Sequence, residues 1–322
     1  MSVILVTGGA GFVGHHVAAA LLARGDTVRV LDNLDPFYDP ALKRHNLERL
    51  EAAAGGRLEF VEGDLRDPDA CRRAAAGIDA TVHLAALAGV RPSILDPARY
   101  LDVNVVGTQR LLDALAETKG RPLVFGSSSS VYGGNTEVPY SEAHAVDWPV
   151  SPYAASKKAG EVVCHAWHHL TGTPVTCLRL FTVYGPGQRP EMAIHKFARL
   201  LLAGEALPFY GAGDTARDYT FVTDIVDGIL AALDRARGYR IYNLGGSVAT
   251  SLKQLVEMLE RAFGARAELE RLPEQPGDMR FTHADVGRAQ RELGWRSRVT
   301  LEEGLRQFAD WYLQMRAEGR LA

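Results

Sequence analysis

Two stretches of the sequence carry side chains that could act on a hydroxyl group. In the first, SPYAASKKAGE, Tyr153 precedes Lys157 by four residues. On a helix this spacing puts both side chains on one face, where an ammonium favours the phenolate and lowers the pKa of the tyrosine. Such a tyrosine can take a hydroxyl proton while a hydride leaves the same carbon. The pair alone is a weak signal, because a half-buried tyrosine and a surface lysine give the same pattern.

The second stretch is GSSSSVYGGN, in which four serines, Ser127–Ser130, close a predicted strand at 122–128. Serine hydroxyls donate and accept hydrogen bonds, but they supply neither an acid nor a base at neutral pH. The row is therefore either a plain turn or a set of hydrogen-bond partners for a polar substrate. In the second case it limits the reaction, because any proton transfer must come from another side chain.

A glycine-rich turn near the N-terminus predicts a dinucleotide site. In VTGGAGFVG, Gly8, Gly11 and Gly14 lie between a predicted strand and a predicted helix. They permit a tight turn, a close approach to a pyrophosphate and close helix packing, and the helix start offers free N–H groups. The second strand ends at Asp32, whose carboxylate suits an adenosine ribose and repels a 2′-phosphate, which favours NAD over NADP. Asp64, after the third strand, is either an adenine-side contact or a helix cap.

The elements that must position these residues alternate along the first half of the chain. Helical patterns, including long ones at 96–118 and 152–171, separate short apolar runs at 3–7, 27–32, 58–64, 80–86, 122–128 and 175–180. This order predicts βαβ units and a Rossmann-type, doubly wound parallel sheet of the α/β class, covered by helices on both faces.

We therefore expect two parts, with an NAD-binding domain over residues 1–180. Regular alternation ends after Leu180, where Gly and Pro cluster, and helical patterns return only at about 251–264 and 300–318. Residues 181–322 are expected to form mainly a smaller α/β lobe for the substrate. The chain is expected to cross back into the main sheet around 218–243.

Composition excludes several classes of function. The chain has 322 residues and a formal net charge of −3, with a pI near 6.4, which argues against nucleic acid or an anionic membrane as partner. The three cysteines lack metal-ligand spacing and suggest buried thiols in a reducing compartment. The histidines have no matching acidic ligand set, so no metal is predicted. The start, MSVILVTGG, predicts a strand and not a signal peptide, and no apolar stretch could span a bilayer, so we expect a cytoplasmic protein.

Together these motifs resemble the extended short-chain dehydrogenase/reductase family, specifically its nucleotide-sugar branch. The likeness runs nearly end to end, through EGDL, HLAA, SSSSVYG, SPYAASK, RLFTVYGP, RDYTFVTDI and the late QPGD and LGW. It implies a tightly held NAD, a UDP- or dTDP-sugar substrate and a homodimer packed through the helices at about 96–118 and 152–171. It also implies that Tyr153, Lys157 and Ser128 are catalytic, with Ser128 bonded to the reacting sugar hydroxyl.

The resemblance gives a full set of expected contacts. Cofactor contacts are expected at Gly8, Gly11, Phe12, Val13, Gly14, Asp32, Asn33, Asp64, Leu65, Ala85, Ala86, Asn104, Ser127, Tyr153 and Lys157. Substrate contacts are expected at Ser128, Ser129, Ser130, Tyr153, Thr182, Arg189, Arg217, Asp278 and Arg91. Of these, Arg217 suits a diphosphate because a guanidinium can bind phosphate with two hydrogen bonds, and Asp278 is implied as the acceptor for the uridine ribose. The family's second diphosphate arginine is replaced here by Glu274-Gln275-Pro276, with Arg280 as an alternative.

The serine row narrows the reaction. Family members that dehydrate or decarboxylate their sugar carry acidic side chains after the first hydroxyl, whereas this chain has Ser129 and Ser130. Dehydration needs an acid and a base on neighbouring carbons. Removal and return of a hydride at one carbon needs only Tyr153, so the sequence predicts a sugar epimerase.

Several stretches look most like UDP-glucuronate 4-epimerases, among them YDPALKR, AGVRPS, GGNTEVPYSE and FTVYGPGQRPEMAIHKF. Thr182 stands where UDP-galactose 4-epimerases usually have Asn; it is a candidate donor to a sugar carboxylate, or else a hydroxyl at a strand end. Arg189 is a candidate cation near the substrate, or else a surface arginine in a Pro-rich loop. Arg91 is a second candidate cation. UDP-glucose/galactose epimerisation and a non-catalytic NAD-binding sensor remain as alternatives.

Overall fold

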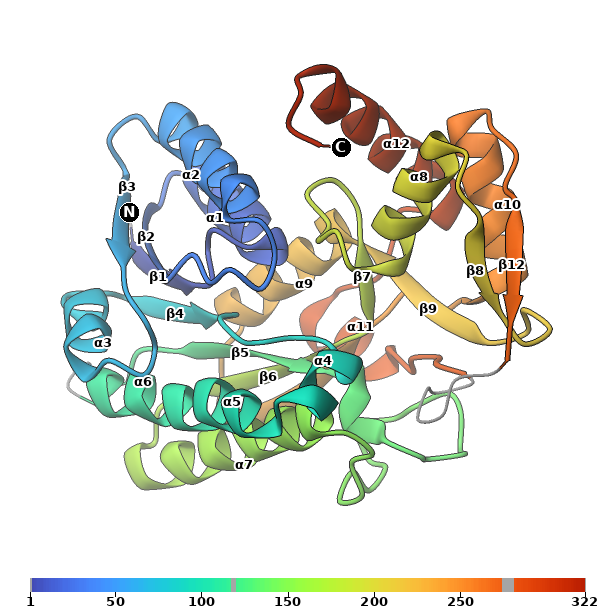
Figure 1. Cartoon of the computed structure of the whole chain (residues 1–322). Helices are drawn as coiled ribbons and strands as arrows, with labels where there is room; N and C mark the ends of the chain where they lie inside the picture. The colour runs from blue at the N-terminus through green and yellow to red at the C-terminus, as the bar shows by residue number, and fades with distance from the viewer. Residues whose placement is uncertain (1, 117–119, 274–280, 322) are drawn as a thin grey trace.

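A parallel sheet of seven strands carries the first part of the chain (Figure 1). The computed structural model describes residues 2–116, 120–273 and 281–321. The strand order is β10-β6-β5-β4-β1-β2-β3, and every neighbouring pair is parallel. The strands are β1 (Val3–Thr7), β2 (Thr27–Asp32), β3 (Leu58–Glu62), β4 (Ala80–His83), β5 (Leu123–Ser128), β6 (Val175–Leu180) and β10 (Tyr239–Leu244). The predicted Rossmann-type doubly wound fold is confirmed.

Helices cover both faces of this sheet, which explains why its strands are continuous apolar runs. Ile4 and Val6 of β1 pack into one core and Leu5 into the other, because alternate side chains point to opposite faces. The first core is closed by α1 (Phe12–Arg24), α2 (Pro40–Ala54) and α9 (Val222–Asp234). The second is closed by α3 (Pro68–Ala75), α6 (Gly107–Leu115) and α7 (Pro152–Thr171).

The sheet positions a site because its strand order reverses between β1 and β4. In open α/β sheets, ligands bind at such a reversal, outside the carboxyl ends of the strands. Both the β1–α1 turn and the end of β5 open at this edge.

The helical pattern predicted for 96–118 is interrupted in the structure. It consists of α5 (Pro97–Leu101), the π-helical turn η1 (Asp102–Val106) and α6, preceded by the short α4 (Val90–Leu95). In η1 the Asn104 side chain points to the loop after β4. Its amide oxygen accepts from the Leu87 N–H at 2.8 Å, and its Nδ2 donates to the Leu87 carbonyl at 2.9 Å. Such turns cluster at functional sites because they redirect one side chain.

The remaining residues form a lobe with its own core beside the sheet (Figure 1). It contains a three-stranded sheet of β11 (Ala249–Ser251), β9 (Ala216–Phe221) and β7 (Thr182–Tyr184) and a two-stranded sheet of β12 (Leu269–Leu272) and β8 (Leu207–Tyr210). Its helices are α8 (Ala193–Ala203), α10 (Leu252–Phe263) and α12 (Leu301–Ala317), while α11 (Gly287–Leu293) packs beside β10.

The segment predicted to return to the main sheet, 218–243, is divided between the two parts. Strand β9 pairs with β7 and β11 in the small sheet, whereas α9 and β10 join the Rossmann layers. Among the described residues, no helix is both long enough and apolar enough to cross a membrane.

Candidate active site

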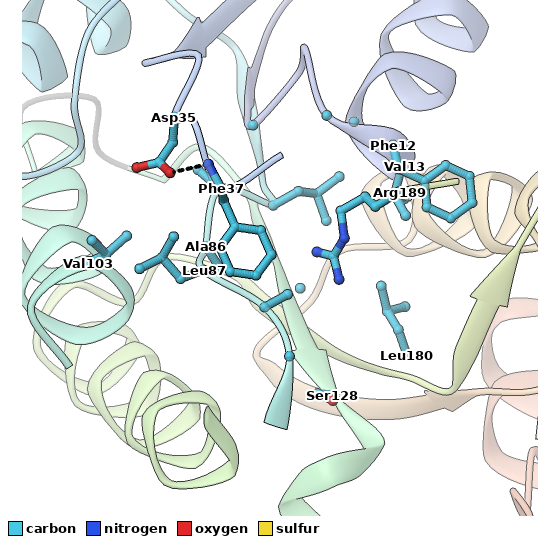
Figure 2. Close-up of a pocket in the computed structure, with 18 of the residues that line it drawn as sticks. Phe12, Val13, Asp35, Phe37, Ala86, Leu87, Val103, Ser128, Leu180 and Arg189 are labelled. Carbon is cyan, nitrogen blue, oxygen red and sulfur yellow. Dashed lines mark hydrogen bonds between the residues drawn. The ribbon is translucent and has the colours of Figure 1, made fainter. Parts of the chain in front are cut away.

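A cavity of about 390 Å³ lies across the carboxyl ends of the parallel strands and extends to the second lobe. Figure 2 shows side chains that enter it from the glycine turn, from the β4 and β5 ends and from the loop that carries Arg189. The predicted site residues in its wall are Gly8, Gly11, Phe12, Val13, Gly14, Asp32, Asn33, Asp64, Leu65, Ala85, Ala86, Ser127, Ser128, Ser129, Ser130, Tyr153, Lys157, Thr182 and Arg189.

The glycine turn has the geometry that a dinucleotide needs. Gly8 has a φ of +70°, and a Cβ there would lie 2.8 Å from the Ala85 nitrogen. A Cβ on Gly14 would overlap the Gly8 carbonyl oxygen, so only glycine allows α1 to start this close to β1. Gly11 caps α1 without a side chain and leaves the first N–H groups facing the cavity. The wall therefore fits a pyrophosphate.

Asp32 ends β2 at the far side of this turn. Its carboxylate is buried and accepts hydrogen bonds from the Ala10 and Leu34 N–H groups at 3.1 and 2.9 Å. Burial raises the pKa of Asp32, and the nearby Lys43 ammonium opposes that rise. The carboxylate is thus fixed by the backbone at the place where the sequence predicts an adenosine ribose.

Asp64 lines the same cavity as Asp32 but is already paired. The Arg66 guanidinium donates to both of its oxygens at 2.9 Å, and Asn33 Nδ2 donates at 2.9 Å. The hydrogen bonds from Arg66 lower the pKa of Asp64 to about 2. The cap of α3 is Asp67, so the helix-cap alternative for Asp64 is wrong, and its carboxylate stays at the cavity rim.

Tyr153 sits in the first turn of α7, at the opposite end of the cavity. Ser151 caps this helix, and the Tyr153 N–H donates to Ser93 Oγ at 3.1 Å. The Ser128 hydroxyl lines the same end of the cavity as the phenol. Burial raises the pKa of Tyr153, and the Ser128 hydroxyl and the Arg189 guanidinium oppose the rise. The structure thus brings the predicted tyrosine and serine together.

Lys157 lies one turn further along α7, and only 5 % of it is exposed. Its ammonium donates to the Gly126 carbonyl oxygen at 2.7 Å and lies 5.3 Å from the centre of the Phe125 ring. Burial lowers the pKa of Lys157 to about 8. The expectation that Lys157 sets a lowered pKa for Tyr153 is wrong in this structure, because burial dominates and the opposing cation is Arg189.

The four serines do not act as one row. Ser127 Oγ points into the protein and donates to Glu161 Oε1 at 2.7 Å. Ser128 Oγ accepts from the Ser130 N–H at 3.1 Å and so begins the 3₁₀ turn η2 (Ser129–Tyr132). This turn presents Ser129 and Ser130 to the cavity beside Ser128. The described wall therefore holds several hydroxyls and no carboxylate next to Tyr153.

The second lobe closes this end of the cavity with Thr182 and Arg189. Thr182 begins β7, which joins the small sheet by pairing with Tyr219. The Arg189 guanidinium forms an ion pair with Glu191 at 2.7 Å and reaches into the cavity (Figure 2). The surface-arginine alternative for Arg189 is thus wrong, and its guanidinium faces the Tyr153 end.

Three predicted contacts lie outside the cavity wall. The Asn104 amide donates hydrogen bonds to the Leu87 carbonyl and, at 2.9 Å, to the Ser156 hydroxyl. It therefore stabilises the loop after β4 and does not face the cavity. Arg91 places its guanidinium 5.6 Å from the centre of the Tyr210 ring in β8. Arg217 lies on β9 and donates to the Ala216 carbonyl at 3.0 Å. Asp278, with the alternative clamp Arg280, lies outside the described residues.

Residues of the β2–α2 loop and of the start of α2 line the cavity without having been predicted. They are Asp35, Phe37, Tyr38 and Lys43. The segment YDPALKR resembles other sequences, but no spacing or periodicity assigns its side chains to a site. Within the described ranges, no cluster of three His, Cys, Asp or Glu side chains could hold a metal ion.

Comparisons with known proteins agree with this geometry. Residues 4–245 match the NAD dependent epimerase/dehydratase family. The chain belongs to this family. It is 44% identical to UDP-glucuronate 4-epimerase 3 of Arabidopsis thaliana over 331 residues, which cover 96% of the chain and 76% of that protein. It is 38% identical to the UDP-glucuronate 4-epimerase of Thermodesulfobacterium geofontis, and the match covers 97% of this chain and 96% of that protein.

Among solved structures, the chain resembles UDP-glucuronic acid 4-epimerase from Bacillus cereus in complex with UDP-glucuronic acid and NAD. The TM-score is 0.91 at 35% identity, and the match covers 97% of this chain and 99% of that one. The family's shared fold thus extends over both lobes.

Proposed function

We propose that the protein is an NAD-dependent UDP-glucuronate 4-epimerase, which interconverts UDP-glucuronate and UDP-galacturonate through a 4-keto intermediate. The observation that carries this proposal is the Tyr153 end of the cavity. Tyr153 lies there together with Ser128 and the buried Lys157. The other side chains that η2 presents to the cavity, Ser129 and Ser130, are hydroxyls. Such a set can move one proton at one carbon, and it lacks the second acid–base group that dehydration needs.

In this mechanism the residues around C4 handle the proton. The glycine turn and Asp32 would hold NAD, which would supply the group that takes up and returns a hydride at C4. Tyr153 takes the proton of the 4-hydroxyl, while Ser128 holds that oxygen by a hydrogen bond. The Arg189 guanidinium favours the phenolate form that Tyr153 must have before it takes this proton, and Lys157 is assigned to the nicotinamide ribose. The keto sugar turns about its bonds to the diphosphate, and Tyr153 then returns the proton to the new hydroxyl.

The substrate carboxylate needs its own partners, because the 4-keto intermediate is a β-keto acid that can lose carbon dioxide. Thr182, Ser129 and Ser130 line the cavity as hydrogen-bond donors, and Arg189 adds a charge. We assign these groups to the carboxylate. A carboxylate held with its C–C bond out of alignment with the carbonyl π-system resists that loss.

The nucleotide part of the substrate is assigned to the second lobe. Arg217 lies on β9 of this lobe and is the proposed diphosphate partner. Asp278 is the proposed partner of the uridine ribose. Arg91 is better explained as a contact between α4 and Tyr210 of β8, because its guanidinium lies over that ring.

We also propose a cytoplasmic homodimer. Exposed apolar side chains gather on α4, α5, η1 and α7, including Leu95, Leu101, Val106 and Val162, which are 88%, 45%, 44% and 55% exposed. A second copy of the same helices would cover them. Cys71, Cys164 and Cys177 are free and buried, as suits a reducing compartment.

The deciding experiment uses the purified protein without added cofactor. It is incubated separately with UDP-glucuronate and with UDP-glucose, and the sugar anomeric protons are followed by NMR. Conversion of UDP-glucuronate alone to UDP-galacturonate is expected. Conversion of UDP-glucose alone would favour the neutral-sugar epimerase and remove the carboxylate roles of Thr182 and Arg189. A pentose product would show that the keto acid is not protected, and no change in either sample would favour the NAD-binding sensor.

A further inference from the structure

The β2–α2 loop places an aromatic ring inside the cavity that the proposed mechanism does not use. Phe37 lines the cavity wall and is only half-buried there. Figure 2 shows its ring between the β4 end, at Ala86 and Leu87, and the Arg189 guanidinium. A large apolar ring that remains partly exposed inside a cavity gains stability when a ligand covers it.

The position of Phe37 is fixed by its neighbours. The Asp35 carboxylate accepts a hydrogen bond from the Phe37 N–H at 2.9 Å. It also accepts from Arg99 Nη2, which lies 3.0 and 2.7 Å from its two oxygens. Lys43 Nζ donates to the Asp35 carbonyl at 2.8 Å. Arg99 belongs to α5 and Lys43 to α2, so two helices hold the loop. The ring is therefore presented to the cavity by a built structure and not by a free loop.

Arg189 meets this ring from the other lobe. Its guanidinium carbon lies 5.9 Å from the centre of the Phe37 ring, within the range of a cation–π contact. The loop that carries it is also fixed: buried Gln188 donates to the Val183 carbonyl at 3.2 Å, and His16 Nε2 bonds the Pro186 carbonyl at 2.8 Å. The two loops thus meet across the cavity between the glycine turn and Ser128.

We propose that Phe37 and Arg189 form a bridge across the cavity that retains the dinucleotide from one turnover to the next. This inference rests on the proposed function, in which the same cofactor molecule must take up and return the hydride. An enzyme of that kind gains from slow cofactor release, and a contact that must open before release acts mainly on the dissociation rate. Phe37 is then a cofactor-retaining residue, and Asp35 and Arg99 position it.

The test measures how fast the purified holoprotein loses NAD. Wild type, Phe37→Ala and the control Phe60→Ala are diluted into buffer, and an NAD-specific dehydrogenase reports the NAD that is released. Phe60 is 37% exposed on β3 and lies outside the cavity wall, so its truncation removes the same atoms elsewhere. We expect Phe37→Ala to release NAD about tenfold faster than wild type, as for loss of a good aromatic contact, and Phe60→Ala to match wild type.

The outcomes separate this inference from the proposed function. Wild type that holds NAD, together with Phe37→Ala that releases it within about twofold of the wild-type rate, would overturn the bridge alone. Wild type that neither holds nor binds NAD would overturn the proposed function. Equal melting temperatures of the apo forms of wild type and Phe37→Ala would show that a faster release does not come from a damaged fold.

A second variant tests whether Asp35 and Arg99 position Phe37. Arg99→Ala removes the bonds that fix Asp35 but leaves every residue of the cavity wall in place. It is expected to raise the NAD release rate severalfold, less than Phe37→Ala does. The double variant should release NAD no faster than Phe37→Ala, because the two act on one contact. A wild-type release rate in Arg99→Ala would remove the positioning role, and additive effects in the double variant would contradict the shared contact.

Discussion

Burial and contacts from distant segments set the character of the single residues at the Tyr153 end. The sequence places Tyr153 and Lys157 on one helix face, and the structure does so as well. It cannot show that the Lys157 ammonium is held by the Gly126 carbonyl, or that Arg189 reaches the same end from another lobe. These two contacts decide which charges act on the phenol, and both join residues far apart in the chain.

Replacing Tyr153 with phenylalanine removes only the proton-handling oxygen. We expect kcat for UDP-glucuronate to fall at least about a hundredfold, which is the usual effect of losing a general base. The ring and the cavity wall remain, so the amount of NAD bound after purification should stay at the wild-type level. The conversion is followed by NMR, and bound NAD is measured after denaturation. Wild-type turnover in this variant would show that another group moves the proton.

At the scale of elements, prediction succeeded where local signals and burial agree. Strands β1, β2, β5 and β6 match their predicted runs closely, because continuous apolar segments bounded by polar or turn residues fit only a sheet covered on both faces. The π turn at Asn104 was not predictable, since the hydrogen bonds that Asn104 makes there go to Leu87, 17 residues away in sequence. Phe37 was missed because loop side chains carry no periodicity. Lys43 was missed because helix periodicity does not show that its ammonium reaches back to the Asp35 carbonyl in the preceding loop.

A buried ion pair between α7 and β6, with a hydrogen bond from β5, lies beside η2. Glu161 of α7 and Arg179 of β6 make two bonds of 2.9 Å, and both residues are 1% exposed. Ser127 of β5 donates to the same carboxylate. Since the pair is shielded from water, each partner depends on the other for its charge.

Glu161→Gln should therefore lower the free energy of unfolding by about 3 kcal/mol, because it leaves the Arg179 charge buried without a counter-charge. Urea unfolding at pH 7 measures this loss. The double variant E161L/R179L removes both charges and should recover most of the stability. A single variant as stable as wild type, or a double variant less stable than the single one, would contradict this account of how α7 is held to the sheet.

For the molecule as a whole, buried histidines link folding to pH. Burial lowers the pKa values of four of them, His15, His16, His83 and His195, and that of His83 falls to about 3. The His83 ring lies between the Thr7 and Thr108 hydroxyls at 2.6 and 2.9 Å, so the fold holds it neutral. Asp218 acts in the opposite direction, because burial raises its pKa to about 6. Burial also raises the pKa values of Asp32, Glu142 and Asp227. The four histidines act against these carboxyls, and each histidine titrates near pH 6.5 in the unfolded chain.

The protein should accordingly lose stability as the pH falls below about 6.5, the pKa of an unfolded histidine. There the unfolded chain takes up protons that the folded chain refuses until much lower pH, so the free energy of unfolding decreases. For His83 alone the loss is about 2 kcal/mol between pH 7 and pH 5. Urea unfolding at the two pH values tests this. His83→Gln, whose amide can still bond both threonines, should show a smaller loss than wild type, whereas replacing the exposed His169 by Gln should leave the loss unchanged. Equal stability of the wild type at both pH values would mean that its buried histidines become protonated within the fold.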